Sequence, residues 1–456
     1  MQDSHSYDLV ILGGGAAAFA AITEASRRGL TTAMVNTGLP LGGTCVNVGC
    51  VPSKHLLAVG ESTQAPRENP FDAVQYSKGE PTVDWATALD GTDALVERFR
   101  RENYVDVAKH YETDVFEGYG KLIGDTTIEV VDGADEGTRL SGERALIATG
   151  SSPWTPPIDG IGDVDYYTSE MILEERDLPG SIVIVGGGYI ALEWGQILHH
   201  VGVEVTILQR SERVLSDMED QLGREMQRAF RSEGIDIVVD NEFQRVRPAT
   251  AADGDASTQS GVTVVTNVDG TDRTVTADAL FVATGVQPNS DDIGLDAVGV
   301  ETDADGTVRV DDQFRTTNPD VYAAGDVIGE PELETVAAKE GNHVIKNAFG
   351  NEGATIDYDA VPAVVFTSPE VAAVGTTETE YMAEHGTCSC RTVQMADVPR
   401  AKAVGNTDGL VQVVKHHETD EIVGAHMVGP RAADMIMEAT LAVRFSLTVD
   451  DIIDTS

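Results

Sequence analysis

The residues best suited to chemistry are two of the four cysteines, Cys45 and Cys50, in the stretch LGGTCVNVGCVPSKHLL. Their spacing can close a small disulfide loop. Pro52 predicts that a helix starts here, so Cys50 lies at a helix N-terminus, where backbone N–H groups and the helix dipole favour a thiolate. Lys54 follows on the same helix face. Such a thiolate attacks a disulfide or binds a soft metal; the alternative is a pair of buried structural cysteines.

A nucleotide-binding fingerprint lies near the start of the chain. The apolar strand YDLVIL runs into Gly13-x-Gly15-x-x-Ala18 and then into a helix. These glycines allow a tight turn and close approach of a pyrophosphate, which the helix N-terminus then binds. The next strand ends at Asn36, where an acid usually binds the ribose hydroxyls. Asparagine can still accept one hydrogen bond there.

The same pattern recurs in SIVIVGGGYIALEWGQILHH, with Gly186-x-Gly188-x-x-Ala191 between a strand and a helix. Two such units in one chain predict two bound dinucleotides in two similar domains.

The strand that follows the second fingerprint ends in Gln209 and Arg210, with Arg213 close by. An NAD site places an acid at this strand end, whereas arginine accommodates the 2′-phosphate of NADP. We therefore expect NADPH, with a solvated basic surface as the alternative.

The segment GGTCVNVGCVPSK, together with the two fingerprints, resembles the flavin-dependent pyridine nucleotide-disulfide reductases. The resemblance covers about Tyr7 to Asp450 and implies FAD and NADPH as cofactors. The FAD site it implies comprises Gly13, Gly15, Ala18, Asn36, Gly42, Gly43, Thr44, Ala148, Thr149, Gly150, Gly325 and Asp326. The NADP site comprises Gly186, Gly188, Tyr189, Ala191, Gln209, Arg210, Arg213 and Gly285.

The resemblance also implies an electron route from NADPH through FAD to the Cys45/Cys50 disulfide. In it, Cys50 lies against the flavin and Cys45 meets the substrate. Lys54 and Glu193 match an ion pair beside the reactive nitrogen of the flavin, and Tyr189 matches a side chain that covers the nicotinamide pocket.

The expected fold is α/β, with two doubly wound Rossmann-like domains and an α+β C-terminal domain. Residues 1–155 and 286–356 should form the FAD domain, 156–285 the NADPH domain, and 357–456 a dimerisation domain that makes a homodimer. Between the first fingerprint and its later strands, we expect a loop from Glu61 to Gly79 and a helix interrupted near Gly91.

The segments AVVFTSPEVAAVG and DVPRA resemble mercuric reductase more than dihydrolipoamide dehydrogenase. This favours reduction of Hg(II), held as substrate by Cys45 and Cys50. Dihydrolipoamide or another small-molecule disulfide remains an alternative substrate, and a non-catalytic flavin-binding scaffold is a second alternative. Relatives continue into a His-Glu dyad or a cysteine pair, so we expect the native product to extend beyond Ser456.

The composition is strongly acidic, with a formal net charge of −45 and eight lysines against twenty-three arginines. The acidic residues are spread along the chain, which is typical of a halophilic surface. Such a charge disfavours nucleic acid and anionic membranes as partners. The sequence has no long apolar span, its start has no basic leader, and it contains few cysteines. We therefore expect a cytoplasmic protein.

The remaining candidates are Cys388 and Cys390, and the pairs His199-His200 and His416-His417. In a regular strand the two cysteines would be too far apart for an easy disulfide, which leaves edge-strand thiols or an accessory metal pair. Neighbouring histidines on a helix or strand diverge and make poor chelates.

Overall fold

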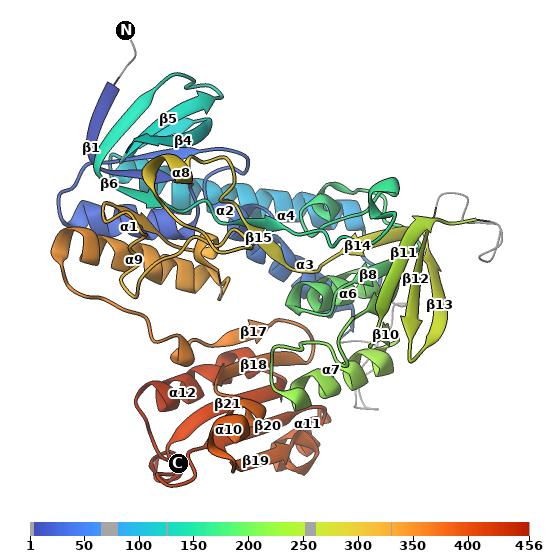
Figure 1. Ribbon diagram of the computed structural model, residues 1–456. Coiled ribbons are helices and arrows are strands. Elements are labelled where there is room, and N and C mark those ends of the chain that lie inside the picture. Colours follow the sequence, from blue (N-terminus) through green and yellow to red (C-terminus); the bar gives the residue numbers. More distant parts are fainter. Residues whose placement is uncertain (1–3, 65–80, 125, 251–260, 330, 456) are drawn as a thin grey trace. The chain divides into compact units, whose positions relative to one another are not determined.

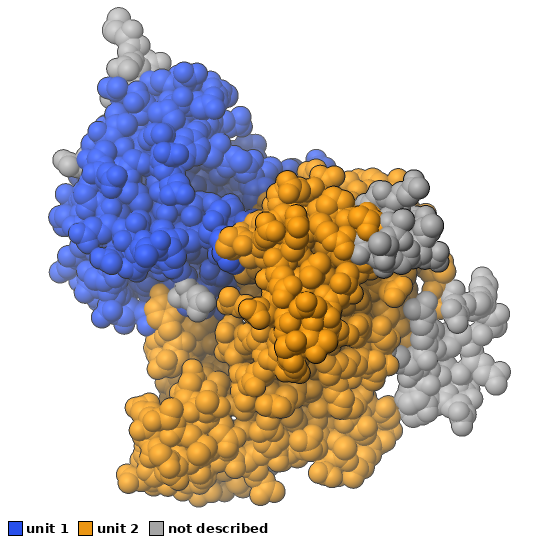
Figure 2. Space-filling view, turned by 45° about the vertical axis from the view of Figure 1, so that its right-hand side comes forward, with its two compact units in different colours: residues 1–52, 91–154, 286–356 blue, residues 53–90, 155–285, 357–456 orange. Residues whose placement is uncertain are grey.

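The computed structural model describes residues 4–64, 81–124, 126–250, 261–329 and 331–455. The chain divides into two compact units (Figure 2): one of residues 1–52, 91–154 and 286–356, the other of residues 53–90, 155–285 and 357–456. The chain passes between the units within helix α3 (Cys50–Gln64), within helix α4 (Trp85–Arg100), and again after residues 154, 285 and 356.

The first unit is built on a seven-stranded sheet in the order β3-β2-β1-β6-β5-β4, with β16 also paired to β6 (Figure 1). Strands β1, β2, β3, β6 and β16 run parallel, whereas β4 and β5 are antiparallel additions. The strands are β1 (Ser4–Leu12), β2 (Thr32–Asn36), β3 (Asp114–Glu117), β4 (Tyr119–Gly124), β5 (Thr127–Asp132), β6 (Arg139–Ile147) and β16 (Val321–Ala323). Continuous apolar runs such as LVIL in β1 are completely buried, as both faces of the sheet are covered.

Helices α1 (Ala16–Arg27) and α9 (Glu334–Gly350) pack against each other in this unit (Figure 1). Their backbones approach so closely that a Cβ at Gly341 would collide with the Ala17 carbonyl oxygen. The unit also contains α2 (Gly43–Asn47), α5 (Asp106–His110), α8 (Leu295–Val298) and the paired strands β7 (Ser151–Pro153) and β15 (Val286–Pro288).

The second unit contains a four-stranded parallel sheet in the order β10-β9-β8-β14, again of the doubly wound kind. Its elements are β8 (Ser181–Val185), α6 (Tyr189–His200), β9 (Glu204–Leu208), α7 (Asp220–Glu233), β10 (Asp236–Val238) and β14 (Ala279–Val282). An antiparallel sheet of β11 (Glu242–Pro248), β12 (Val262–Val268) and β13 (Thr271–Ala277) is inserted before β14.

A five-stranded antiparallel sheet, in the order β17-β18-β21-β20-β19, forms the C-terminal part of the second unit (Figure 1). Its strands are β17 (Ala363–Val365), β18 (Glu370–Gly375), β19 (Ser389–Gln394), β20 (Leu410–Lys415) and β21 (Ile422–Gly429). Helix α12 (Ala432–Arg444) packs on one face through Ala432 and Ile436. The other helices here are α10 (Glu378–His385), α11 (Pro399–Val404) and α13 (Val449–Ile453).

Two expectations for the segment after the cysteines were wrong. Helix α3 continues to Gln64, past the expected loop start at Glu61, and the following residues 65–80 lie outside the described part. Helix α4 passes through Gly91 without interruption and is followed by a π-helical turn, Arg101–Val105. A helical glycine costs only about 1 kcal/mol relative to alanine, which burial of Leu89 and Val96 on either side offsets.

Within the described ranges, none of the helices combines the length and apolar character needed to cross a bilayer.

Candidate functional site

The two cysteines of the opening motif lie on consecutive short elements of the chain. Cys45 is in the middle of α2 and is partly buried, while Cys50 is the first residue of α3 and is exposed. Both are free thiols in this structure. The expected helix N-terminus at Cys50 is therefore present, and Lys54 follows one turn later on α3.

The surroundings of Cys45 favour its protonated form. A hydrogen bond to Cys50 is the main cause that raises the pKa of Cys45, followed by burial and by the negative charges of Cys50 and Glu334. The proton therefore stays on Cys45 at neutral pH. Cys50 lies at the positive end of the α3 dipole.

A set of local contacts fixes the loop that carries Cys45. Gly42 and Gly43 both have positive φ, 106° and 61°, which glycine adopts without strain. The Asn47 amide donates to the carbonyl oxygens of Pro40 and Gly43, at 2.9 and 2.8 Å, and its oxygen accepts from Arg100 Nε at 2.8 Å. A buried asparagine with both ends engaged holds the loop in one conformation.

Tyr104, from the π-helical turn, packs against this loop. Its ring lies where a side chain on Gly42 would be, 3.2 Å from a hypothetical Cβ, and contacts Phe19 edge-on with ring centroids 4.8 Å apart. Burial raises the pKa of Tyr104 to about 12, with contributions from Glu334, Cys45 and Cys50. Its hydroxyl therefore keeps its proton at neutral pH.

The first glycine fingerprint forms the turn between β1 and α1. Gly13 has φ of 109°, and a Cβ there would collide with the carbonyl oxygen of Ala148, which follows β6. A Cβ on Gly43 would lie 2.9 Å from the Cα of Gly15, so the cysteine loop and the fingerprint turn touch through backbone alone. Ala18 is completely buried in α1, and Thr44 is exposed in α2. Such a bare backbone surface fits a pyrophosphate.

Asn36 lies at the end of β2, as expected, beside this turn. Its amide nitrogen donates to the Leu39 carbonyl oxygen at 2.9 Å, and its Oδ1 lies 2.7 Å from the position that a Cβ on Gly14 would take. The side chain is thus held against the glycine turn with an oxygen acceptor directed toward it.

Asp326 and the segment Ala148–Gly150 lie together in the first unit. Asp326 Oδ2 accepts from Ser151 Oγ at 2.7 Å, and the Gly325 N–H donates to Glu340 Oε2 at 2.7 Å. Thr149 Oγ1 is buried and has no hydrogen-bond partner among the described residues. A buried hydroxyl without a partner, next to a glycine with positive φ, fits a surface that binds a polar cofactor.

Lys54 and Glu193 form an ion pair within the second unit. Lys54 Nζ lies 2.7 Å from Glu193 Oε2, and the other carboxylate oxygen accepts from the Phe366 backbone N–H at 3.0 Å. The Lys54 ammonium also lies over the Phe366 ring, 5.1 Å from its centroid. Both ends of the buried carboxylate are satisfied, which fixes the lysine in place.

The second fingerprint repeats the geometry of the first. Gly186 has φ of 126°, and a Cβ there would collide with the Ala283 carbonyl oxygen, just before the positive-φ Gly285. Gly188 precedes α6, with open space where its side chain would be. Ala191 is completely buried in this helix, whereas its first residue, Tyr189, is 41% exposed.

The two arginines expected near the NADP phosphate differ in their surroundings. Gln209 is buried at the end of β9, and its Oε1 accepts from the Arg210 backbone N–H at 3.0 Å. The Arg210 side chain is exposed, and no hydrogen bond or ion pair joins it to another described residue. Arg213, in contrast, is paired with Asp220 at 2.6 Å and donates to the Ser216 carbonyl oxygen at 2.9 Å. The Arg213 guanidinium is therefore engaged within its own loop. Of these two arginines, Arg210 is the one whose guanidinium has no partner among the described residues.

Cys388 and Cys390 correct the sequence expectation, because they form a disulfide. The regular-strand spacing does not apply: β19 begins only at Ser389, and the Cα atoms are 5.7 Å apart, within disulfide range.

The expectation that His416 and His417 diverge was also wrong. Both lie just after β20, where their rings stack with centroids 4.9 Å apart, and Tyr381 Oη is hydrogen-bonded to His417 Nδ1 at 2.8 Å. In the other pair, His200 is buried against the Glu233 carboxylate and His199 Nε2 lies 3.2 Å from the Glu233 carbonyl oxygen. None of these four side chains is part of the metal-ligand groups among the described residues.

Sequence reasoning missed Asn47, Tyr104, Glu334 and Glu340 around the first unit's site. Asn47 and Tyr104 brace the cysteine loop, Glu334 acts on the charge of Cys45, and Glu340 binds the Gly325 backbone. Glu340 itself could have been found from the sequence, because it is an acidic residue among the apolar positions of α9. It is only 3% exposed, and a buried acid usually has a specific partner.

Comparison with known proteins agrees with this geometry. Residues 7–341 match the pyridine nucleotide-disulphide oxidoreductase family, and residues 361–456 match the dimerisation domain of that family. A mercuric reductase from Lysinibacillus sphaericus is 39% identical over 452 residues, 99% of this chain and 79% of that protein. A dihydrolipoyl dehydrogenase from Bacillus subtilis (strain 168) is 33% identical over 444 residues, 96% of this chain and 91% of its own length.

Among solved structures, the Cu(II) complex of the HOCl-induced flavoprotein disulfide reductase RclA from Escherichia coli superposes with a TM-score of 0.83. The match has 25% sequence identity and covers 97% of this chain and 94% of that one. The predicted α/β fold, with two nucleotide-binding domains and a C-terminal α+β dimerisation domain, is confirmed. The chain carries the family's dimerisation domain, which supports a homodimer.

With its two glycine turns, its cysteine pair and a family match along nearly its whole length, the chain belongs to the pyridine nucleotide-disulphide oxidoreductases, flavoprotein disulfide reductases that use FAD and NAD(P)H.

Proposed function

We propose that this oxidoreductase uses NADPH to reduce Hg(II) to Hg(0). The observation that carries the proposal is the cysteine pair, in which Cys45 keeps its proton through its hydrogen bond to Cys50, and Cys50 starts helix α3. Two such sulfurs are strong ligands for a soft cation. The 39% identity with a protein named mercuric reductase, over almost the whole chain, supports the choice of Hg(II).

FAD fits the first unit, where Gly13, Gly15 and Gly43 leave bare backbone for its pyrophosphate and Asp326 and Asn36 supply polar side chains. Bound FAD would supply the transfer of two electrons between NADPH and the cysteines. We assign residues 1–155 and 286–356 to the FAD domain, 156–285 to the NADPH domain and 357–456 to the dimerisation domain.

The two cysteines act on the metal together. Both sulfurs hold Hg(II), and Cys45 binds it with release of its proton, because a bound cation lowers the pKa of its ligand. Two electrons reduce the bound ion to Hg(0), which leaves both thiolates free. The overall reaction is NADPH + Hg(II) → NADP⁺ + H⁺ + Hg(0).

NADPH is preferred over NADH because Arg210 is exposed near the end of β9 and forms no ion pair with another described residue, whereas an NAD site would carry an acid there. We assign to Tyr189, exposed at the start of α6, the role of covering the nicotinamide. Lys54, fixed by Glu193, supplies the positive charge that stabilises reduced flavin.

The dimer surface is expected to include the exposed apolar residues of α12 and the segment after it. Met437, Leu441 and Phe445 are 52%, 49% and 68% exposed, an arrangement typical of a protein interface. The acidic surface indicates that the dimer works in concentrated salt.

A panel of NADPH-oxidation assays tests the proposal, with Hg(II) in excess thiol, lipoamide and oxidised glutathione as acceptors. We expect kcat/KM for Hg(II) to exceed that for either disulfide by at least about 10-fold. The double variant Cys45→Ser/Cys50→Ser should lose this activity, whereas Cys388→Ser/Cys390→Ser should keep it. Faster turnover of lipoamide than of Hg(II) would reject the assignment.

Dihydrolipoamide oxidation is the second candidate, favoured by the 33% identity with a dihydrolipoyl dehydrogenase over 96% of the chain. The same assay, run with NAD⁺ and dihydrolipoamide, decides between the two. A flavin that NADPH fails to bleach would instead support the non-catalytic scaffold.

A further inference from the structure

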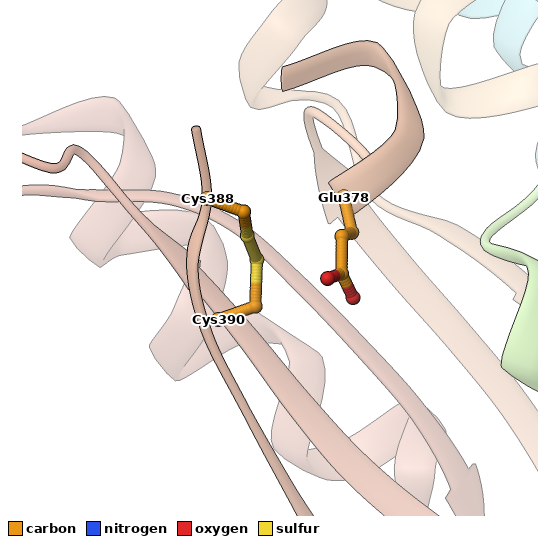
Figure 3. A group of neighbouring side chains, drawn as sticks. All are labelled: Glu378, Cys388 and Cys390. Atoms are coloured by element: carbon orange, nitrogen blue, oxygen red, sulfur yellow. A yellow bond between two sulfur atoms is a disulfide. The ribbon is translucent and has the colours of Figure 1, made fainter. Parts of the chain in front are cut away.

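Three side chains with metal-binding atoms meet at the edge of the five-stranded sheet, away from the opening cysteine motif in the sequence. They are Glu378, Cys388 and Cys390, and their ligand atoms all lie within 4.8 Å of one another. Figure 3 shows the Glu378 carboxylate directed toward the disulfide that joins the two cysteines. All three residues are partly exposed, so solutes can reach them.

Sheet register explains why these residues meet. Thr392 of β19 lies directly opposite Gln412 of β20, so the two side chains share one face of the sheet. Cys390 is two residues before Thr392 and therefore projects from the same face. Helix α10 begins on this face, since Gln412 Nε2 donates to Glu378 Oε2 at 2.6 Å.

Gln412 provides a second and independent indication of a ligand. Its side chain is completely buried, and one end of the amide holds the Glu378 carboxylate. The other end, Oε1, is buried and accepts no hydrogen bond from any described residue. A buried carbonyl oxygen without a partner is uncommon in folded proteins and is explained where it faces an ion or water.

The surroundings carry negative charge. The backbone N–H of Glu378 donates to Glu219 Oε2 at 2.9 Å, and Glu219 is only 3% exposed. Glu380 lies close to the same helix start, where its Oε2 accepts from the Thr377 backbone N–H at 2.9 Å and from Thr377 Oγ1 at 2.8 Å. Nearby anions stabilise a cation and oppose a further anion.

We propose that the reduced Cys388/Cys390 pair, together with Glu378, binds a thiophilic divalent cation of the Zn(II), Cd(II) and Hg(II) class. Two thiolates and one carboxylate, which Gln412 Nε2 holds in place, match the ligands that such ions prefer. In the disulfide form the sulfurs are bonded to each other and cannot serve as thiolate ligands. The site is therefore available only under reducing conditions, and it does not depend on the proposed Hg(II) reduction.

The redox step needs an external reductant, which we identify as a low-molecular-weight dithiol. Its two thiols break the Cys388–Cys390 bond by exchange, passing two electrons and two protons to the cysteines and becoming a cyclic disulfide themselves. Binding of the divalent cation then displaces the two cysteine protons.

Equilibrium dialysis with Cd(II) tests the site in the full-length flavoprotein carrying Cys45→Ser and Cys50→Ser, which removes the other thiols. Excess Mg(II) occupies sites made of carboxylates alone. We expect the dithiol-reduced protein, freed of reductant under argon, to bind one Cd(II) per chain at least about 10-fold more tightly than the oxidised protein. This comparison uses one polypeptide in two states, so it does not rely on a substitution that affects folding.

Glu378→Gln in the same background should weaken Cd(II) binding by the reduced protein by about 10-fold or more, the usual effect of losing a supporting ligand. Glu384→Gln is the matched control and should have no effect, because Glu384 is on the same helix but is not part of the group whose ligand atoms lie within 4.8 Å of one another. Equal Cd(II) affinity in the reduced and oxidised states would overturn the proposal. So would alkylation of both cysteines without prior reduction, since it would show that no disulfide forms.

Discussion

Lys54 and Glu193, 139 residues apart in sequence, form an ion pair with an Nζ–Oε2 distance of 2.7 Å. Glu193 is buried and Lys54 is 33% exposed, so the pair joins a fixed anion to a cation that still meets solvent. The Phe366 N–H donates to the second carboxylate oxygen. The carboxylate is therefore held at both oxygens and cannot turn away from the lysine.

The first prediction concerns this pair. Glu193→Gln keeps an acceptor for the Phe366 N–H but leaves the Lys54 ammonium without its counter-charge, so the free energy of unfolding should fall by about 1–3 kcal/mol. The loss is below that of a fully buried pair because Lys54 is partly solvated. Denaturant titration at fixed salt measures it. Asp90→Asn, which breaks the exposed pair with Arg176, is the control and should change the free energy by less than about 0.5 kcal/mol.

The second prediction concerns the charge on Cys45. Because the hydrogen bond and charge of Cys50 raise the pKa of Cys45, Cys50→Ser should lower that pKa toward the ordinary thiol value of about 8.5. Cys45 would then be alkylated by iodoacetamide at a lower pH than in the unmodified chain, as followed by peptide mass spectrometry. Glu334→Gln removes a charge that contributes less to the pKa of Cys45, so it should shift the alkylation profile in the same direction by a smaller amount. A profile that moves to higher pH would contradict the proton assignment.

Local sequence signals were enough to predict the cysteine helix and both glycine turns. In each case a few consecutive residues set the geometry: Cys50 starts α3, and Gly13 and Gly186 adopt positive φ between a strand and a helix. Such features depend on backbone conformations that only certain residues allow.

Features set by distant partners could not be predicted. Arg213 appeared equal to Arg210 in sequence, but its pairing with Asp220 depends on how α7 packs. The contact between Glu340 and the Gly325 N–H joins a helix to a loop after a strand, and the Cys388–Cys390 disulfide depends on where β19 begins. In each case the tertiary structure overrode the local pattern.

The third prediction follows from the difference between the two arginines. Arg210→Glu should lower the NADPH/NADH ratio of kcat/KM by about 10–100-fold, the effect of replacing a charge-assisted contact of 1.5–3 kcal/mol. Arg273→Glu, exposed on β13, makes the same change in net charge and should leave the ratio unaltered. An unchanged ratio in Arg210→Glu would remove this residue from the coenzyme site.

The fourth prediction concerns salt. At a net charge of −45, like charges repel across the surface, and screening shortens from about 10 Å at 0.1 M salt to about 3 Å at 1 M. The thermal midpoint of unfolding should therefore rise steadily with NaCl, while an equal osmolarity of sucrose should raise it less. Full activity and an unchanged midpoint after prolonged dialysis into dilute buffer would reject the halophilic interpretation.

The last prediction tests whether the first glycine turn holds FAD. Gly13 combines a φ of 109° with a backbone approach so close that an added Cβ would collide with the Ala148 carbonyl oxygen. Gly13→Ala must therefore move β1 relative to β6 at the point where the pyrophosphate should bind, and FAD affinity should fall by at least about 10-fold. Gly38→Ala is the matched control: its φ of 71° is also positive, but nothing lies within 4 Å of the added Cβ. Backbone strain in this variant should lower the free energy of unfolding by roughly 1–2 kcal/mol, without altering the cofactor surface.

Flavin content per chain and FAD titration of the apoproteins give the comparison. If both variants lost FAD equally, strain rather than close approach would explain the effect, and the assignment of this turn to the pyrophosphate would fail.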